Sequence, residues 1–387
     1  MPSIFRRVTP QGICLICLSS ALLAQGQSIP TESSRWRFEG DATVAEYQQR
    51  KAIRLNGGAA TVKEMELRDG IIDVDFVSPG GRAFFGPQFR IDEENGSGEW
   101  VYLRPHKSGL PDALQYTPLL NGSLMWQIYN GPGFTGRLEI PKDTWFHLRL
   151  EIVGAQAKLY VVDMEKPCLT MNDLKSGNQK GLISFANLTG TVYLSNLEIR
   201  ETPPAAWERH LPQMPPNTLT DWDLSPDYDA LARDLERPLS DAESSAMTWQ
   251  DVKAEPPGFV VVNRYRQGPS LRVSFSDDFS KRLEPQKGMK VVYARTTIIA
   301  ERDQIKKLSI GYSDDVSVFL NGTILFRGRS AQNFRDPGFL GIVNPENDAV
   351  YLPLKKGPNE LLLAVSELGG GWGFICRLDD MPSQATR

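Results

Sequence analysis

Polar and aromatic side chains that could bind a ligand are concentrated between Tyr102 and Asn121. Alternation along a β-strand would place Tyr102 and Arg104 on one face, with Val101 and Leu103 on the other. Pro105 would end that strand, and the loop after it carries His106, Asp112, Gln115, Tyr116 and Asn121. Forked donors and acceptors suit sugar hydroxyls, and an aromatic ring suits the C–H surface of a sugar. The segment therefore predicts a cleft that binds carbohydrate.

Two further residues are candidates for the same cleft. Arg90 follows Gln88 by two positions, so we expect it to point to the same side of a strand and to form a second wall. Trp126 could stack on a sugar ring. The alternatives are a solvated strand face for Arg90 and a core position for Trp126.

The polar segment also has a purely structural interpretation. An exposed loop is polar because water surrounds it, and an ion pair between Arg104 and Asp112 would hold it in place. If the cleft is instead catalytic, His106 is the candidate base near neutral pH, with Asp112 or Glu99 orienting it.

Several other chemistries lack their sequence signatures. The chain has no His/Cys cluster with metal-ligand spacing, no Gly-rich phosphate loop and no Gly-x-Ser-x-Gly motif. No cofactor is therefore expected. Carbonyl and carboxylate oxygens can bind Ca²⁺ in such proteins, but no loop here identifies the ligands.

Short segments of alternating apolar and polar residues predict an all-β fold. They run from Trp36 to Ile199 and resume at Gly258, with turn residues such as Asn121-Gly122 between them. Asn321-Gly322 predicts a tight hairpin. Residues 201–257 are rich in proline and predict a linker, in which residues 225–237 have the apolar spacing of one short helix. We therefore expect two antiparallel β-sandwich (jelly-roll) domains, at residues 35–200 and 258–380, joined by this linker.

The first residues predict export. Arg6 and Arg7 precede a short apolar segment that ends in small residues, so residues 1–26 are expected to be a cleaved signal peptide. The protein would be secreted or periplasmic, and no segment is long enough to insert into a membrane. The net charge of −4 and the lack of a basic block argue against nucleic acid as a partner. Cys168 and Cys376 remain after cleavage, and free thiols are favoured over a disulfide between them.

Four segments of the first domain carry a resemblance to a known family. They are Phe84-FGPQFR, the long stretch from Glu99 to Gly131, Trp145-FHLRLEIVGAQAKLYV and Gly190-TVYLSNLEI. Residues 35–200 resemble the concanavalin A-like lectin/glucanase jelly roll, including its laminin G-like members and the bacterial 3-keto-disaccharide hydrolase-like domains. Residues 258–380 resemble galactose-binding-like sandwiches through Val318-FLNG, Leu354-KKGPNELLLAV and Gly370-GWGF. Both resemblances imply an oligo- or polysaccharide as the ligand.

The resemblance also draws attention to carboxylates. Glucanases of this fold place two carboxylates about two strand residues apart and facing a cleft. Asp73 and Asp75 have that spacing but lack the full Glu-Asp-Glu pattern, and Asp92-Glu93-Glu94 is more typical of a solvated loop. In the second domain, Trp372 and Phe374 could stack on a sugar, although sealing the sandwich is the favoured interpretation.

Three functions follow from the sequence. We expect first a protein that binds carbohydrate without turnover. The alternatives are a glycoside hydrolase-like enzyme that uses the same cleft, and a structural or adhesion module that binds protein. The sequence does not specify the glycan or the oligomeric state.

Overall fold

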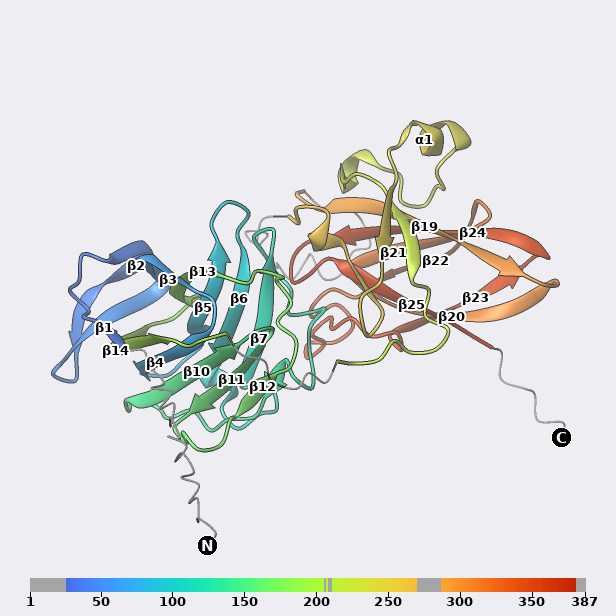
Figure 1. Ribbon diagram of the computed structural model, residues 1–387. Coiled ribbons are helices and arrows are strands. Elements are labelled where there is room, and N and C mark those ends of the chain that lie inside the picture. Colours follow the sequence, from blue (N-terminus) through green and yellow to red (C-terminus); the bar gives the residue numbers. More distant parts are fainter. Residues whose placement is uncertain (1–25, 205–206, 208–210, 270–286, 381–387) are drawn as a thin grey trace, which may run out of the picture.

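The computed structural model describes residues 26–204, 207, 211–269 and 287–380. Its strands form two lobes that lie side by side, the first from the N-terminal half of the chain and the second from the C-terminal half (Figure 1). The prediction of an all-β protein with antiparallel sheets is confirmed. The predicted signal peptide lies outside the described residues, apart from Gly26. We call the two lobes the N-terminal sandwich (residues 27–201) and the C-terminal sandwich (residues 221–379).

The N-terminal sandwich contains fourteen strands. They are β1 (Gln27–Ile29), β2 (Trp36–Tyr47), β3 (Arg50–Leu67), β4 (Gly70–Val77), β5 (Phe85–Asp92), β6 (Ser97–Leu103), β7 (Leu114–Leu120), β8 (Ser123–Leu124), β9 (Thr135–Gly136), β10 (Phe146–Val153), β11 (Gln156–Val161), β12 (Leu169–Met171), β13 (Gly181–Asn187) and β14 (Val192–Glu201). One turn of 3-10 helix, η1 (Pro105–Lys107), follows β6.

Strand β3 joins the two layers of this sandwich. Its residues 53–55 pair with β14 and its residues 58–67 pair with β13. We call β12-β11-β10-β4-β14-β3 the back sheet and β3-β13-β5-β6-β7-β8 the front sheet. The core between these two sheets follows from strand alternation. In β10, Leu148 and Leu150 are buried in one cluster with Val101 and Leu103 of β6, and every second residue of β10 is only partly buried.

The C-terminal sandwich has two sheets, ordered β17-β15-β19-β24-β21-β22 and β18-β25-β20-β23, with a short β16 paired to β19. Its strands are β15 (Asp221–Leu224), β16 (Tyr228–Asp229), β17 (Gln250–Lys253), β18 (Phe259–Val261), β19 (Lys290–Ala300), β20 (Gln304–Ser313), β21 (Asp315–Leu320), β22 (Thr323–Arg329), β23 (Asp348–Leu354), β24 (Gly357–Glu367) and β25 (Gly373–Asp379). The predicted hairpin is confirmed, because Asn321 and Gly322 have positive φ and connect β21 to β22. Trp372 and Phe374 are fully buried in the core, which confirms their sealing role.

The segment predicted as a linker contributes to the second lobe. Strands β15 and β17 extend one of its sheets, and a 3-10 turn forms at η2 (Ala230–Ala232). A further 3-10 turn, η3 (Val262–Arg264), follows β18 beyond this segment. The short helix was predicted at residues 225–237, and that position is wrong: α1 is at Asp241–Ala246. It begins at a capping box in which Ser240 and Glu243 satisfy each other's backbone N–H groups.

The two lobes are in direct contact. Met125, Ile128 and Tyr129, which follow β8, form an apolar cluster with Val261, Val343 and Ile375 of the C-terminal sandwich. Backbone hydrogen bonds cross the same junction, from Gln127 to Gly370 and from Val343 to Gln127. The loop after β8 therefore anchors the second lobe to the edge of the front sheet.

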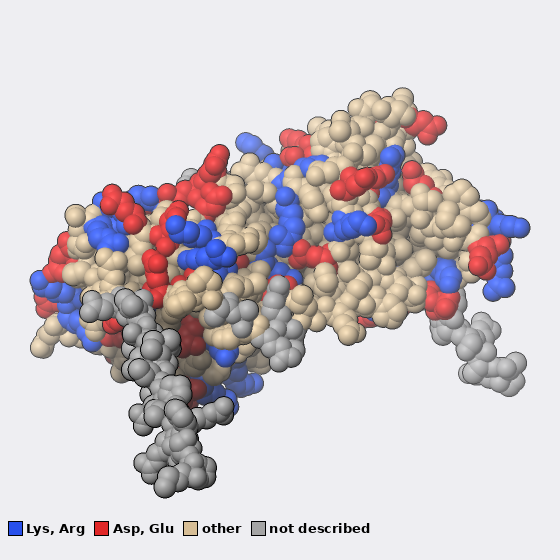
Figure 2. Space-filling view, in the orientation of Figure 1, with Lys and Arg blue, Asp and Glu red and all other residues tan. Residues whose placement is uncertain are grey.

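Three other sequence-based expectations concern the charge of the surface, the thiols and membrane-spanning segments. Lys and Arg are interspersed with Asp and Glu on the face that Figure 2 shows. Cys168 and Cys376 are both free, as expected. Burial raises the pKa of the Cys168 thiol to about 11, so this group is a poor nucleophile. In the part of the chain that the structure describes, no helix combines the length and apolar character needed to cross a membrane.

Candidate functional site

Tyr102, near the end of β6, and Arg104, the residue after that strand, lie on the outer face of the front sheet. Tyr102 packs in a cluster separate from the core that contains Val101 and Leu103, so the predicted alternation is correct. The Arg104 guanidinium is 5.6 Å from the centre of the Tyr102 ring. Its Nη2 is 3.4 Å from Gln115 Oε1 and 3.5 Å from Asp112 Oδ2. Arg104, Asp112 and Gln115 are thus brought together as predicted.

His106 lies beside the same group of residues. Its ring is exposed, and its centre is 5.1 Å from that of the Phe84 ring, which in turn is 6.0 Å from that of Tyr102. Partial burial and the positive charges of Arg82, Arg104 and Lys107 lower the pKa of His106. The imidazole is therefore mainly neutral near pH 7, with one donor and one acceptor nitrogen.

Asp112 is the anion of this group. Its carboxylate accepts a hydrogen bond from Lys107. Burial alone would raise the pKa of Asp112, but the bond from Lys107 and the charge of Arg104 outweigh it, so the pKa is lowered. Asp112 is therefore ionised at neutral pH and acts as a hydrogen-bond acceptor.

An aromatic cluster extends this site along the front sheet. It contains Trp100, Tyr102, Phe84 and Trp126, and the last two are only partly buried. Two buried donors, Trp100 Nε1 and Arg104 Nε, have no hydrogen-bond partner among the described residues. We call Phe84, Tyr102, Arg104, His106, Asp112 and Trp126 the Arg104 patch.

Glu99 and Tyr116 were predicted at this site, but they point into the sandwich instead. Glu99 is fully buried and accepts hydrogen bonds from Tyr116 Oη (2.8 Å), Ser176 N (2.9 Å) and Ser176 Oγ (2.7 Å). Tyr116 pairs across strands with Val101, which sets it on the core face. Glu99 also lies two residues before Val101, so strand alternation places it on that same face.

Arg90 is also interior, and the prediction that it forms a wall of the cleft is wrong. Its φ of 52° lies in the left-handed region, at an irregularity in the pairing of β5 with β13. The side chain is thereby turned inward. It donates to the backbone oxygens of Arg68 and Gly154 and pairs with Asp69 at 3.2 Å.

Gln115 and Asn121 have structural contacts that the sequence did not reveal. Gln115 is fully buried and donates to the backbone oxygens of Tyr116 (2.9 Å) and Tyr129 (3.0 Å). Asn121 Nδ2 donates to the backbone oxygen of Asn263 in the C-terminal sandwich at 2.7 Å. The Gln115 amide therefore joins Arg104 to the backbone near Tyr129, whereas the Asn121 amide contacts the C-terminal sandwich and not the Arg104 patch.

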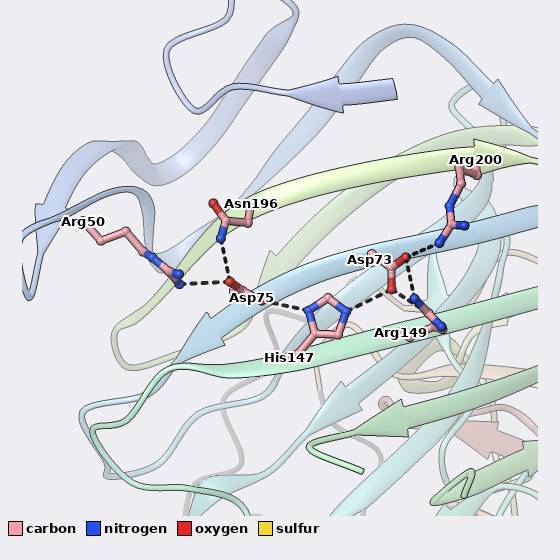
Figure 3. Close-up of polar contacts among 7 residues, drawn as sticks. All are labelled: Arg50, Asp73, Asp75, His147, Arg149, Asn196 and Arg200. Atoms are coloured by element: carbon pink, nitrogen blue, oxygen red, sulfur yellow. Dashed lines mark hydrogen bonds and ion pairs between the residues drawn. The ribbon is translucent and has the colours of Figure 1, made fainter. Parts of the chain in front are cut away.

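A second polar cluster lies on the outer face of the back sheet (Figure 3). His147 of β10 lies between two carboxylates of β4, with Nδ1 2.8 Å from Asp75 Oδ1 and Nε2 3.0 Å from Asp73 Oδ1. Arg149 and Arg200 also bind Asp73, at 2.7 and 2.9 Å, and Arg50 binds Asp75 at 3.0 Å. The alternating positions of Asp73 and Asp75 could be read from the sequence, but the pairing of β4 with β10, which brings His147 to them, could not.

This second cluster is poorly suited to acid–base catalysis. Burial raises the pKa of Asp73, but hydrogen bonds from Arg149, Arg200 and His147 outweigh burial and lower the pKa overall. An Asp held ionised cannot be the proton donor of a glycosidase pair. The cluster instead ties β4, β10 and β14 together.

In the part of the chain that the structure describes, no three His, Cys, Asp or Glu side chains converge as a metal site would require. No protein-family model matches the chain, and no curated protein matches it.

Solved structures are similar over less than half of the chain. The carbohydrate-binding module CBM66 from Bacillus subtilis is 18% identical, with a TM-score of 0.34, over 43% of this chain and 96% of that one. A Bacillus subtilis protein of unknown function with a galectin-like fold is 12% identical, with a TM-score of 0.35, over 47% and 100%. Domain 4 of AbnA, a GH43 extracellular arabinanase from Geobacillus stearothermophilus solved with arabinotriose, is 16% identical, with a TM-score of 0.27, over 48% and 87%. At these TM-scores the similarities carry no conclusion about the function of this chain.

Proposed function

We propose that this protein is exported and binds an oligo- or polysaccharide at the Arg104 patch of its N-terminal sandwich, without turnover. One observation carries the proposal: partly exposed aromatic rings, Phe84 and Trp126, share a cluster with Tyr102 beside the hydrogen-bonding groups of Arg104 and His106. Rings bind the C–H surface of a sugar, and forked donors bind its hydroxyls. The resemblance of residues 35–200 to concanavalin A-like lectins and of residues 258–380 to galactose-binding-like domains agrees with it, and we propose the N-terminal and C-terminal sandwiches as the two domains.

Binding without cleavage is favoured by the protonation states at the patch. The pKa of Asp112 and that of His106 are both lowered, so at neutral pH Asp112 is a carboxylate and His106 a neutral imidazole, and neither is the general acid that glycoside cleavage needs. Glu99, whose burial raises its pKa, is enclosed in the sandwich and does not reach the outer face. Glycan cleavage and protein adhesion are the competing functions.

A glycan array probed with the mature protein tests the proposal. Arg104→Ala and His106→Ala should each weaken binding about tenfold or more, which corresponds to about 1.4 kcal/mol. His147→Ala, on the outer face of the back sheet, is the matched control and should bind like the wild type. Unfolding temperatures of all variants are measured alongside, because Arg104 is buried.

The other outcomes separate the alternatives. Shortened products from the bound oligosaccharide would indicate a glycoside hydrolase. A blank array would favour the adhesion module. Equal binding by both patch variants would place the site elsewhere.

A further inference from the structure

A pocket of about 760 Å³ lies at the junction of the two sandwiches. One wall is formed by residues 128–134, 170, 172, 173 and 175 of the N-terminal sandwich, and the other by residues 256, 257, 259, 342–345 and 375 of the C-terminal sandwich. Residues 211, 212 and 215, which connect the two sandwiches, also line the pocket. The volume falls in the range typical of small-molecule sites, roughly 300 to 1,000 Å³. None of its lining residues belongs to the Arg104 patch.

Rigid apolar groups form much of the pocket. Phe134 contributes from the first lobe and Phe259 from the second, and both rings are partly buried. Phe134 is held by ring contacts with Tyr116 at 5.7 Å and Tyr129 at 5.5 Å. Pro256 and Pro257 add inflexible surface beside Phe259. Such flat, preorganised walls suit the apolar face of a ring-shaped ligand.

The charged groups that line the pocket, Asp173 and Lys175, are paired with each other and with Glu255 and Arg264 just outside it. Lys175, whose side chain is 7% exposed, lies 2.8 Å from Asp173 and 3.9 Å from Glu255. Glu255 is also bound by Arg264 at 2.6 Å, and Arg264 donates to the backbone oxygen of Lys175 at 2.9 Å. Two cations and two anions therefore balance, which favours an uncharged ligand over an ionic one.

Asn172 supplies a free hydrogen-bonding group. Its side chain lines the pocket and makes no hydrogen bond to other described residues. The amide NH₂ can donate to a sugar hydroxyl, and the amide oxygen can accept from one. A hydrocarbon ligand would leave this amide unsatisfied.

We propose that the pocket between Phe134, Asn172 and Phe259 binds a neutral sugar ring, which both sandwiches contact at once. The ring lies against the aromatic and proline walls, and its hydroxyls bond to Asn172. This site is separate from the Arg104 patch and does not depend on the function proposed there.

Titration with the methyl glycosides of glucose, galactose, mannose, xylose and arabinose tests the proposal, by calorimetry and by saturation-transfer NMR. At least one glycoside should bind saturably to the wild type. Phe259→Ala and Asn172→Ala should each weaken that binding tenfold or more. Phe38→Ala and Asn196→Ala, at exposed positions of the N-terminal sandwich, are the matched controls and should leave it unchanged.

The outcomes are decisive in each direction. Lack of binding by all five glycosides, or binding that survives both pocket substitutions, overturns the proposal. If Phe259→Ala lowers the unfolding temperature, Asn172→Ala decides, since that side chain makes no hydrogen bond to the described residues. Arg104→Ala should retain pocket binding, so failure of the pocket and failure of the Arg104 patch are measured separately.

Discussion

Gln127, from the loop after β8, reaches into the C-terminal sandwich and accepts a hydrogen bond from the Ser313 hydroxyl at 3.1 Å. Its amide nitrogen donates to the backbone oxygen of Leu340 at 3.2 Å. Gly341 and Gly370 leave room for it, because a Cβ at either position would lie 2.3 or 2.0 Å from the Gln127 amide. One polar side chain of the first lobe is thus enclosed by the second.

Gln127→Ala should weaken the junction between the lobes. The substitution removes the partner of the Leu340 carbonyl and one of the acceptors of the Ser313 hydroxyl, which keeps Glu367 Oε2 at 3.3 Å. Loss of hydrogen bonds of this kind typically costs about 1 to 3 kcal/mol. Denaturant unfolding measures the loss, and hydrogen exchange at the Val343 amide, which bonds to the Gln127 carbonyl, reports local opening. Gln213→Ala, at an exposed position, is the control, and an equal effect of the two variants would contradict the role of Gln127.

Asp314→Asn should flatten the dependence of stability on pH. Burial, together with the charge of Asp315, raises the pKa of Asp314 from 3.8 to about 7. Glu367, which contacts the same Ser313 hydroxyl, also has a raised pKa through burial and the charge of Asp314. The folded protein therefore holds protons on these two carboxylates that the unfolded chain releases, and the one on Asp314 is held up to about pH 7. This contribution to stability is complete below the unfolded pKa and is lost as the pH rises through 7. The free energy of unfolding, measured from pH 4 to pH 8, should fall more steeply for the wild type than for the variant.

Asp251→Asn provides the control for this pH experiment, because Asp251 lies exposed on the same sandwich. Its curve should run parallel to that of the wild type. A parallel curve for Asp314→Asn as well would show that Asp314 does not hold the extra proton.

Alternation along single strands was the most reliable information in the sequence. It placed Tyr102 and Arg104 on the face of β6 that points away from Val101. The same rule, applied two residues before Val101, places Glu99 on the core face. Asn321-Gly322 predicted its hairpin because the turn geometry is local. Ser240 and Glu243 likewise form a local helix-start signal, whereas the apolar spacing at residues 225–237 does not correspond to an α-helix.

Features that depend on partners distant in sequence were not predictable. Arg90 turns inward at an irregularity that arises from the pairing of β5 with β13. Tyr116 faces the core because its strand register sets it opposite Val101. The pairing of β10 with β4 places His147 opposite Asp75, and a single sequence does not reveal this pairing.

Asp73→Asn should destabilise the back sheet. The carboxylate is 8% exposed and accepts hydrogen bonds from Arg149, Arg200 and His147, so an amide would direct an N–H group at cationic donors. We expect a loss of about 1 to 3 kcal/mol in the free energy of unfolding. Glu198→Gln, at a side chain that is 48% exposed beside the same Arg200, should change it by less than about 1 kcal/mol. If Asp73→Asn lowered the free energy of unfolding by no more than Glu198→Gln, the hydrogen bonds to Asp73 would not stabilise the back sheet.

Glu99→Gln should change stability and leave glycan binding intact, the reverse of His106→Ala. Three donors, from Tyr116 and Ser176, converge on the Glu99 carboxylate in the interior, and an amide would replace one acceptor oxygen with a further donor. The expected loss is about 1 to 3 kcal/mol in thermal or denaturant unfolding. His106 is exposed, so its removal should lower glycan affinity while the unfolding temperature stays the same. If Glu99→Gln abolished binding in protein that is still folded, Glu99 would have to contact the ligand, and the site would lie inside the sandwich and not at the Arg104 patch.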